Sequence, residues 1–297
     1  MSSSRPADVR AVVRRLTGEP PRAVHGGAPT RVELADGRAA VLKSAHRQPR
    51  QVAAEVAGLR WLACAGWVPV PEVLGHDDDW LLLEYLPPGR PDRAAASRFG
   101  GDLARLHAAG APAFGSAPPG GPTEAWIGLA PMTNATGTDW PAWYVEHRVR
   151  PYLRLATSSG DLTGAEAEMV EAACRVLPEV AGPPVPPARL HGDLWSGNVC
   201  WSSGGAGGVR GWLIDPAAHG GHPETDLAML ALFGCPHLGA VLAGYREVSP
   251  LAPGWADRVG LHQLFPLLVH VVLFGRGYAG QAVAAARTTV ALADRIP

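Results

Sequence analysis

The hydrophobic pattern of this chain changes at the segment EYLPPG, residues 84–89, and that change limits the folds open to it. Before this segment, alternating or continuous apolar runs predict three strand regions and helical spacing predicts a helix, at residues 30–43, 68–76, 80–86 and 50–65. After it, apolar residues recur at helical spacing over most of the chain. We therefore predict an α+β protein with two lobes: residues 1–86, with an antiparallel sheet and one helix, and residues 87–297, mostly helical.

The N-terminal region carries signals for particular elements. Asp8 is a candidate N-cap for a first helix. The alternating stretch of residues 30–43 contains Asp36-Gly37, a favoured pair for a two-residue hairpin turn. In that register every second residue of the second strand shares one face, so Lys43 projects from near the end of this strand.

The composition disfavours several classes of partner. The chain has 297 residues, a formal net charge of −1 and 18% charged residues, so it has no overall basic field to attract nucleic acid or an anionic membrane. We find no signal peptide or membrane span and expect a cytoplasmic protein. The cysteines lack the paired spacing of a zinc site or disulfide framework, and we expect them to be small buried residues: Cys64, Cys174, Cys200 and Cys235.

One residue is an exception to the composition. Among the 26 lysine and arginine residues, Lys43 is the single lysine. The base composition of the gene would explain the abundant arginine but not this exception. A lysine at a strand end is usually a solvated cation, but its retention here favours a site that needs a compact ammonium ion. Glu55, on the following predicted helix, is the candidate partner of this lysine.

The most informative motif is RLHGDLWSGN, residues 189–198, followed after a second apolar strand by Asp215 in LIDP. Phosphoryl transfer needs one carboxylate to accept a hydroxyl proton, and an amide and a second carboxylate to hold magnesium. Asp193, Asn198 and Asp215 supply that set. A lone HGD is usually a loop with an Asx turn, but the joint occurrence favours a catalytic loop. We expect His191 to be an ordered loop residue rather than a proton carrier.

The chain resembles the fructosamine kinase (ketosamine 3-kinase) family, a branch of the protein-kinase-like, aminoglycoside-phosphotransferase superfamily. The resemblance rests on four segments that occur in the family's order: EYL, FGGDLARLHAAG, LHGDLWSGN and LIDPAAHGGHPETDLAMLALFG. It implies a two-lobed protein-kinase-like fold that uses ATP and Mg2+. It also implies phosphorylation of a sugar hydroxyl of a ketosamine, the adduct of a sugar and an amine, in the deglycation of proteins or metabolites.

The resemblance implies roles for individual residues of this chain. Asp193 would be the catalytic base, and Asn198 and Asp215 would bind magnesium. Lys43 would contact the ATP phosphates, and Glu55 would hold that lysine. The small lobe would then carry the nucleotide-binding sheet, and the helical lobe the catalytic loop and the substrate site.

Further roles follow from the same resemblance. Glu84, Tyr85 and Leu86 would form the hinge, whose backbone meets adenine. Asp226 would be a structural acid that braces the catalytic loop. Trp195 is a candidate substrate residue, with core packing an equal alternative.

Some segments depart from the family pattern or have simpler interpretations. Pro223 precedes Glu224 where the family has an Arg-Glu pair. Gly26 and Gly27 lie where a nucleotide-covering loop is expected, but they suit a plain turn equally well. The run Asp77–Asp79 predicts a solvated turn rather than a metal cluster.

The aromatic residues and the long connection are also open to two interpretations. The connection of residues 111–137 is rich in Gly and Pro and is a candidate functional loop. A nearby aromatic group is expected to include core residues, with some members lining the substrate site: Trp126, Trp140, Trp143 and Tyr144.

Two other functions remain open from the sequence. A kinase of the same fold would act on another small alcohol, such as an aminoglycoside or choline. A pseudokinase would bind nucleotide and serve as an interaction module. The sequence leaves open which sugar is modified, whether the amine carrier is a small molecule or a protein, and the oligomeric state.

Overall fold

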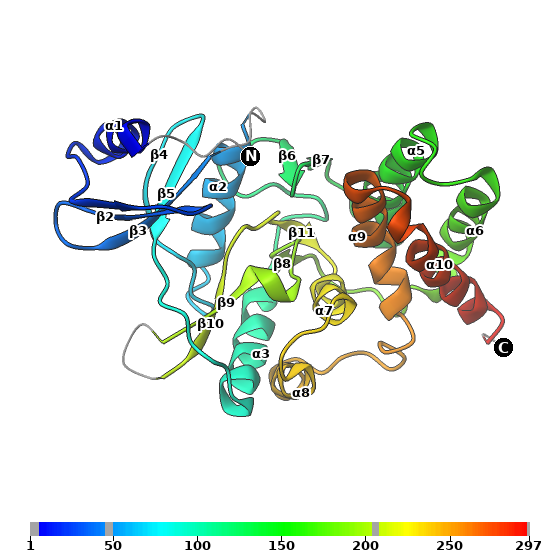
Figure 1. The fold of residues 1–297 in the computed structure, drawn as a ribbon. Coiled ribbons are helices and arrows are strands. Elements are labelled where there is room, and N and C mark those ends of the chain that lie inside the picture. Colours follow the sequence, from blue (N-terminus) through cyan, green and yellow to red (C-terminus); the bar gives the residue numbers. More distant parts are fainter. Residues whose placement is uncertain (1–5, 45–49, 204–207, 296–297) are drawn as a thin grey trace.

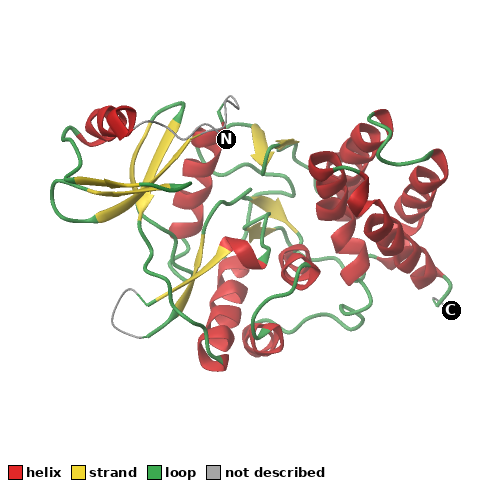
Figure 2. Ribbon diagram, in the orientation of Figure 1, coloured by secondary structure: helices red, strands yellow, loops and turns green. Residues whose placement is uncertain are grey.

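The computed structural model describes residues 6–44, 50–203 and 208–295. The N-terminal part is built on a five-stranded antiparallel sheet of order β1-β2-β3-β5-β4, with two helices packed on it (Figure 1 and Figure 2). The bounds of its elements are α1 Pro6–Thr17, β1 Ala23–His25, β2 Thr30–Glu33, β3 Ala39–Ser44, α2 Gln51–Ala63, β4 Val73–His76 and β5 Trp80–Glu84.

The two helices cover opposite faces of the sheet because side chains alternate along each strand. In β5, Leu82 packs with the apolar residues of α1, whereas Leu81 and Leu83 pack with those of α2. Leu42 of β3 belongs to the α1 side. Alternation therefore places its neighbour Lys43 on the α2 side, as the sequence pattern predicts.

The hairpin between β2 and β3 is present, but the predicted two-residue turn is wrong. The N–H of Leu34 donates to the carbonyl oxygen of Arg38 over 2.8 Å, so residues 35–37 form a three-residue loop. Gly37 adopts a φ of 89°, a left-handed conformation that glycine reaches without steric cost. The chain thus uses the turn glycine with one more loop residue than we expected.

Two other local predictions have different outcomes. Helix α1 begins at Pro6, so Asp8 lies in its first turn and not at the cap. The run Asp77–Asp79 does form the turn between β4 and β5. The carboxylate of Asp77 accepts the N–H of Asp79 at 2.9 Å and of Trp80 at 2.8 Å, and it pairs with Arg15.

Helices form most of the C-terminal part (Figure 2). Their bounds are α3 Arg93–Ala108, α4 Trp140–Tyr144, α5 Arg150–Ser158, α6 Gly164–Val180, α7 Pro223–Leu232, α8 Leu238–Val248, α9 Val259–Phe274 and α10 Ala279–Ala293, with a π-helical turn Val145–Val149 between α4 and α5. One buried core lies among α5, α6, α9 and α10, and a second lies among α3, α7 and α8. The chain thus has the predicted α+β organisation, with an N-terminal sheet and a larger helical part.

Short antiparallel ladders hold the segment around the predicted catalytic loop. The first ladder pairs β9, Val199–Ser202, with β10, Arg210–Leu213, and β10 is the apolar strand that we predicted before Asp215. A second ladder, which we did not predict, pairs β8, Ala188–Leu190, with β11, His219–Gly221. The loop of residues 191–198 therefore runs from one ladder to the other.

The Gly/Pro-rich connection of residues 111–137 contains a hairpin that the sequence pattern did not reveal. Its strands are β6, Glu124–Ile127, and β7, Ala130–Thr133. The Nε2 of Gln51, at the start of α2, donates to the carbonyl oxygen of Gly128 in the hairpin turn over 3.2 Å. This contact joins a helix of the N-terminal part to a hairpin of the C-terminal part.

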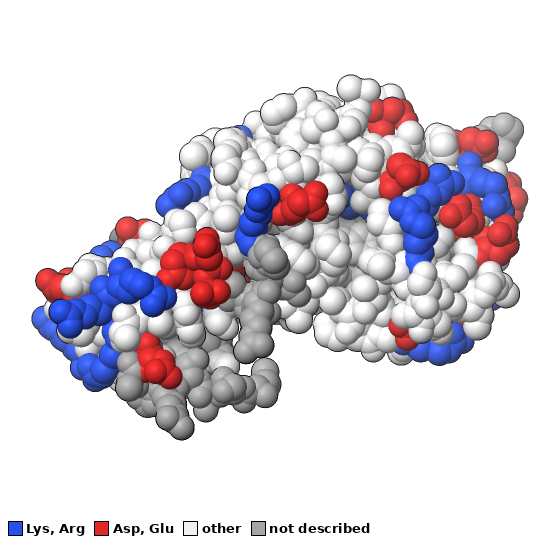
Figure 3. All heavy atoms as spheres, turned by 90° about the horizontal axis from the view of Figure 1, so that it is seen from above, with Lys and Arg blue, Asp and Glu red and all other residues white. Residues whose placement is uncertain are grey.

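The surface agrees only partly with the composition-based expectations. All four cysteines are free, but Cys64 is exposed while Cys174 is buried, so the expectation that all are buried is wrong. On the face seen in Figure 3, acidic and basic side chains are intermixed, in keeping with the near-zero net charge. Within the described ranges, no helix combines the length and apolar character needed to cross a membrane.

Candidate active site

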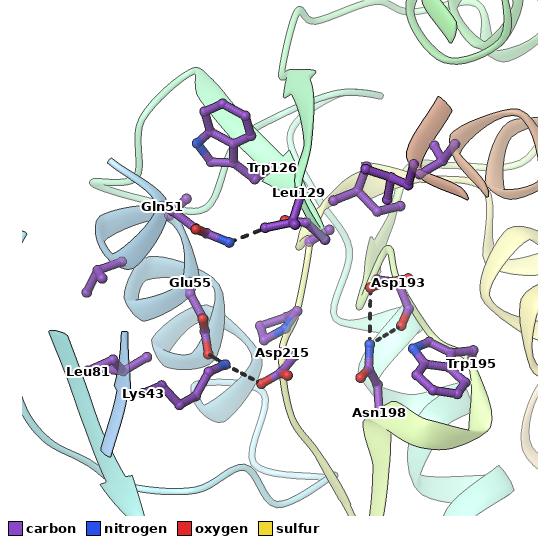
Figure 4. A pocket seen from close by; sticks show the side chains of 18 of the residues that line it. Lys43, Gln51, Glu55, Leu81, Trp126, Leu129, Asp193, Trp195, Asn198 and Asp215 are labelled. Atoms are coloured by element: carbon purple, nitrogen blue, oxygen red, sulfur yellow. Dashed lines mark hydrogen bonds and ion pairs between the residues drawn. The ribbon is translucent and has the colours of Figure 1, made fainter. Parts of the chain in front are cut away.

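A cavity of about 380 Å³ lies between the N-terminal sheet and the C-terminal part. Lys43 reaches it from β3 and Glu55 from α2, whereas Asp193, Asn198 and Asp215 reach it from loops next to β9 and β10. Figure 4 shows Lys43 between Glu55 and Asp215, with Asp193 and Asn198 side by side on the opposite wall. The structure therefore brings together the five polar residues that the sequence motifs single out.

Lys43 is held by two carboxylates. Its Nζ lies 2.8 Å from Oε1 of Glu55 and 2.6 Å from Oδ1 of Asp215. Burial alone would lower the pKa of Lys43, but these two negative charges outweigh it and raise the pKa. The predicted pair of Lys43 and Glu55 is thus present, and it holds a protonated ammonium ion in the cavity.

Asp215 is positioned by an unusual backbone conformation. Its φ is 54°, in the left-handed region, which aspartate tolerates better than most residues with a side chain. Such conformations persist where the surrounding structure holds them. Gly58 of α2 contributes here, because a Cβ at that position would lie only 3.2 Å from Cγ of Pro216. The helix that carries Glu55 therefore packs closely against the segment after Asp215.

Asn198 fixes the orientation of Asp193. Asn198 ends a short 3-10 turn, Ser196–Asn198, and its Nδ2 donates to the carbonyl oxygen of Asp193 at 2.8 Å and to Oδ2 at 3.2 Å. Burial raises the pKa of Asp193 to about 7, the hydrogen bond from Asn198 opposes this shift, and the charges of Asp215 and Asp226 add to it. A carboxylate with such a pKa suits general-base chemistry near neutral pH.

Asp226, on α7, holds the start of the loop from the core side. Its carboxylate accepts the N–H of His191 at 2.8 Å and of Gly192 at 3.0 Å, and it lies 3.2 Å from Nε2 of His107. Gly192 has a φ of 82°, and a Cβ there would lie 2.2 Å from the carbonyl oxygen of Ala217. Asp226 thus makes the bracing contacts that we expected, to a turn that only glycine fits.

His191 is fully buried and uses both ring nitrogens. Its Nδ1 accepts the N–H of Asp193 at 3.2 Å, so its Nε2 carries the proton and donates to the carbonyl oxygen of Ile214 at 2.9 Å. Burial lowers the pKa of His191. These contacts agree with an ordered loop residue that connects Asp193 to the segment before Asp215.

The departure at GHPETD has a structural explanation. Pro223 is the first residue of α7, where its missing N–H costs no hydrogen bond. The ring of His222 accepts the N–H of Glu224 at 3.2 Å and caps the helix. The arginine partner of Glu224 is distant in sequence: Arg258 donates to its two carboxylate oxygens at 2.6 and 3.0 Å.

His222, Glu224 and His262 also lie close enough together to resemble a metal site. The guanidinium of Arg258 already occupies both oxygens of Glu224, and Oγ1 of Thr225 lies 3.0 Å from Nδ1 of His262. A divalent cation would have to lie beside this positive charge among buried residues. We therefore interpret the group as a structural network that supports α7.

The predicted hinge residues lie outside the cavity lining. Glu84, Tyr85 and Leu86 are at the end of β5 and in the segment that leaves it. The N–H of Glu84 donates to Glu72 at 2.9 Å and that of Tyr85 to Ala39 at 3.1 Å, both at carbonyl oxygens. These two amides are engaged within the sheet region, and a contact of this segment with adenine stays a prediction.

The aromatic residues divide between core and cavity. Trp140, Trp143 and Tyr144 are buried in the core, as expected. Trp126 and Trp195 line the cavity, and Trp195 is 38% exposed. Trp195 therefore has a surface open to a ligand rather than a purely packing role.

Sequence reasoning missed other residues that line the cavity. Gln51, Leu129, His270 and Phe274 belong to its wall. No motif marked them individually, although Leu129 lies in the connection of residues 111–137 that we named a candidate functional loop. The hairpin of β6 and β7 supplies Leu129, and the end of α9 supplies His270 and Phe274. By contrast, the Gly26–Gly27 pair lies between β1 and β2, outside the cavity lining.

Asn198 and Asp215 together fit magnesium. Asn198 directs its Nδ2 to Asp193, which leaves its amide oxygen for a cation. A carboxylate and an amide oxygen on one cavity are ligands of the hard type that Mg2+ accepts. The donor chemistry of these two residues thus agrees with the assignment that the sequence motif suggested.

Comparison with known proteins shows which family this chain is similar to. A sequence profile described as fructosamine kinase matches residues 16–291. A Synechocystis protein assigned as a ketoamine kinase is 36% identical over 77% of this chain and 75% of its own length. A corresponding Escherichia coli protein, also assigned as a ketoamine kinase, is 33% identical over 75% of this chain and 74% of its own.

Solved structures extend the comparison to the fold. A Thermobifida fusca chain assigned as a fructosamine-3-kinase has a TM-score of 0.86 and 45% identity, over 95% of this chain and 98% of that one. A macrolide 2'-phosphotransferase from Brachybacterium faecium, at 19% identity and a TM-score of 0.61 over 95% and 98% of the two chains, shares the fold. The fold is thus that of the protein-kinase-like phosphotransferases, and the chain belongs to the fructosamine kinase family.

Proposed function

We propose that this protein is an ATP- and Mg2+-dependent kinase that phosphorylates a sugar hydroxyl of a ketosamine, carried by a small molecule or a protein. The observation that supports it most is the single cavity that contains Lys43, Asp193, Asn198 and Asp215. A pseudokinase would be expected to have lost at least one of these residues. Membership in the fructosamine kinase family supports the choice of acceptor.

In the proposed reaction, Asp193 orients the acceptor hydroxyl and takes its proton. The hydroxyl oxygen forms a bond to the γ-phosphorus of ATP, the bond from that phosphorus to the β–γ bridging oxygen breaks, and ADP leaves. Asn198 holds the carboxylate of Asp193 in place through its hydrogen bond to Oδ2. The raised pKa of Asp193 suits a group that takes up a proton during transfer.

The nucleotide phosphates would lie between Lys43 and the loop that carries Asn198. Lys43 would move its ammonium ion from Asp215 to the phosphates while Glu55 keeps it in position. Asn198 and Asp215 would hold Mg2+, which supplies positive charge to the phosphate oxygens when bound. The segment Glu84–Leu86 would meet adenine, at the division between a nucleotide-binding lobe, residues 1–86, and an acceptor lobe, residues 87–297.

The test is ADP release with magnesium across ketosamines of lysine that carry fructose, ribulose or psicose, and across several aminoglycosides. The phosphorylated product is identified by mass, and the Asp193→Ala variant serves as the blank. We expect turnover of a ketosamine and none of the aminoglycosides. Turnover of an aminoglycoside alone, or of nothing while ATP still binds, would overturn the proposal.

A further inference from the structure

The cavity wall next to Asp193 is aromatic. Trp195 follows the proposed base in the same loop, and His270 and Phe274 reach the cavity from the last turns of α9. Trp195 is 38% exposed and Phe274 is 64% exposed. Large apolar groups of this kind are usually buried, so their exposure at the mouth of the cavity points to a ligand surface.

Two more rings hold this wall in place. Phe233, after α7, meets Trp195 edge to face with ring centroids 6.4 Å apart, and its ring centroid lies 4.8 Å from that of His270. Tyr278 lies 5.0 Å from His270 and 5.9 Å from Phe274, again between ring centroids. The five residues form a continuous aromatic shelf with His270 at its centre, built from three separate parts of the sequence.

His270 contributes a fixed hydrogen-bond acceptor to this aromatic shelf. Its Nδ1 lies 2.7 Å from the carbonyl oxygen of Pro266, and because a carbonyl only accepts, Nδ1 carries the proton. Burial lowers the pKa of His270, which favours the neutral ring at neutral pH. Its Nε2 is then an acceptor, and it has no hydrogen-bond partner among the described residues.

The charges around the cavity favour a substrate that carries a positive charge and has no carboxylate close to it. Three carboxylates line it: Glu55, Asp193 and Asp215. Of the lysine and arginine residues in the described ranges, Lys43 alone lines the cavity, and both of its partners are carboxylates on the nucleotide side. An amino acid attached through its α-amine would therefore bring its carboxylate close to this negative charge, with no free cation among the described residues to offset it.

We propose that the aromatic shelf is the subsite for the amine carrier of the ketosamine and selects apolar or aromatic amines over amino acids attached through their α-amine. This inference rests on the proposed function. With the sugar hydroxyl at Asp193, the carrier extends over Trp195 and Phe274. The secondary ammonium of the ketosamine donates to Nε2 of His270 and lies against the ring faces, where cations are attracted.

The carrier preference is tested with fructose adducts that share the sugar and differ in the amine: benzylamine, methylamine and glycine. We expect kcat/KM for the benzylamine adduct to exceed that for the glycine adduct at least tenfold, roughly the effect of 1.4 kcal/mol. Equal values for these two adducts would overturn the preference.

Variants test the residues. Phe274→Ala should raise KM for the benzylamine adduct about fivefold and leave the methylamine adduct and ATP nearly unchanged, because only the aromatic carrier reaches that ring. Trp67→Ala, which removes an exposed aromatic side chain outside the cavity lining, is the control and should change neither value. An equal rise for both adducts would mean a structural role and would overturn the assignment.

His270 is a positioning residue for the ammonium and should affect every adduct alike. His270→Phe keeps a ring but removes the hydrogen-bond acceptor, so KM should rise for all three adducts with kcat little changed. His270→Gln supplies an acceptor again, so its KM should lie between those of the wild type and His270→Phe. If His270→Phe changes kcat or thermal stability and leaves KM unchanged, the hydrogen bond is not made.

Binding separates this inference from the proposed function. Calorimetry with the Asp193→Ala variant measures affinity for the same adducts without turnover. If the wild type phosphorylates no adduct, the proposed function fails, and tighter binding of the benzylamine adduct would still support the shelf. If the enzyme turns over ketosamines but binds all carriers equally, the shelf fails alone.

Discussion

Two pairs of carboxylates lie on opposite sides of the catalytic loop, and they differ in how their charges are satisfied. Toward the core, Asp226 accepts two backbone N–H groups, and Glu224 accepts both donors of an arginine fork. Toward the cavity, Asp193 has one amide partner and Asp215 has one lysine. The pKa of Asp226 is lowered and that of Asp193 is raised to about 7, although Asp226 is buried and Asp193 only half-buried.

The difference teaches that burial alone does not determine the chemistry of an acid in this fold. Rigid donors stabilise the charged form and make an acid structural, whereas a shortage of donors leaves an acid able to take up a proton. The same loop therefore combines a fixed inner end at Gly192 with an outer end at Asp193 that is able to take up a proton near neutral pH.

Substitution of Asp193 should have the largest effect, and it tests the division between the acids that face the cavity and those that face the core. Asp193→Asn should lower kcat at least about a thousandfold because the proposed base is lost, and thermal stability should stay the same or rise because a half-buried acid with few hydrogen-bond donors is removed. ADP release and thermal melting measure the two effects. Asp78→Asn, in the exposed β4–β5 turn, is the control. An active but destabilised Asp193→Asn protein would contradict the division into reactive and structural acids.

Asp226→Asn should show the opposite pattern. The change removes a charge that accepts from two amides and contacts His107, so the free energy of unfolding should fall by about 4 kcal/mol. Denaturant titration measures this loss. If stability stays at the wild-type value while activity disappears, Asp226 acts in the reaction and not in the fold.

The pH dependence of stability tests whether Glu224 is a structural acid. Burial raises its pKa, but hydrogen bonds from His262 and Arg258 and the charges of His262 and His222 outweigh burial and lower it from 4.5 to about 2. Its contribution to stability is then complete above pH 4.5 and is lost as pH falls toward 2. Glu224→Gln should cost about 3 kcal/mol at pH 7, with the difference from wild type shrinking below pH 4. Glu168→Gln, an exposed acid, should show no such dependence.

Lys43→Arg is the smallest of these changes. The charge is kept, but a planar guanidinium does not place one compact cation between Glu55 and the phosphates. We expect kcat/KM for ATP to fall about tenfold, an effect of about 1.4 kcal/mol. Lys43→Met removes the charge and should lower kcat/KM for ATP further. Wild-type kinetics in the Lys43→Arg variant would show that the site does not need the compact ammonium ion of a lysine.

The sequence was most informative where residue chemistry departs from the rest of the chain. Lys43 is the single lysine, and Asp193, Asn198 and Asp215 stand at a spacing set by one loop and one hairpin. Such short-range patterns can be read without a structure. The α+β organisation followed in the same way from the change of hydrophobic period at residues 84–89.

The acceptor side could not be read in this way. The motif marked Trp195 as a candidate substrate residue, but Phe233 and His270 come from regions with the local pattern of ordinary loops and helices, and only packing brings the three rings together. The hairpin of β6 and β7 was missed because Gly and Pro hid its alternation. Arg258 likewise became visible as the partner of Glu224 only in the folded chain.

The ion pairs of Lys43 have a consequence for the protein's own chemistry. Amines attack the aldehyde of a reducing sugar in their neutral form, and the single ε-amine of this chain is kept protonated between Glu55 and Asp215. The side chains therefore offer a sugar aldehyde almost no nucleophilic nitrogen. An enzyme that works on glycated amines would thus be a poor target for glycation itself.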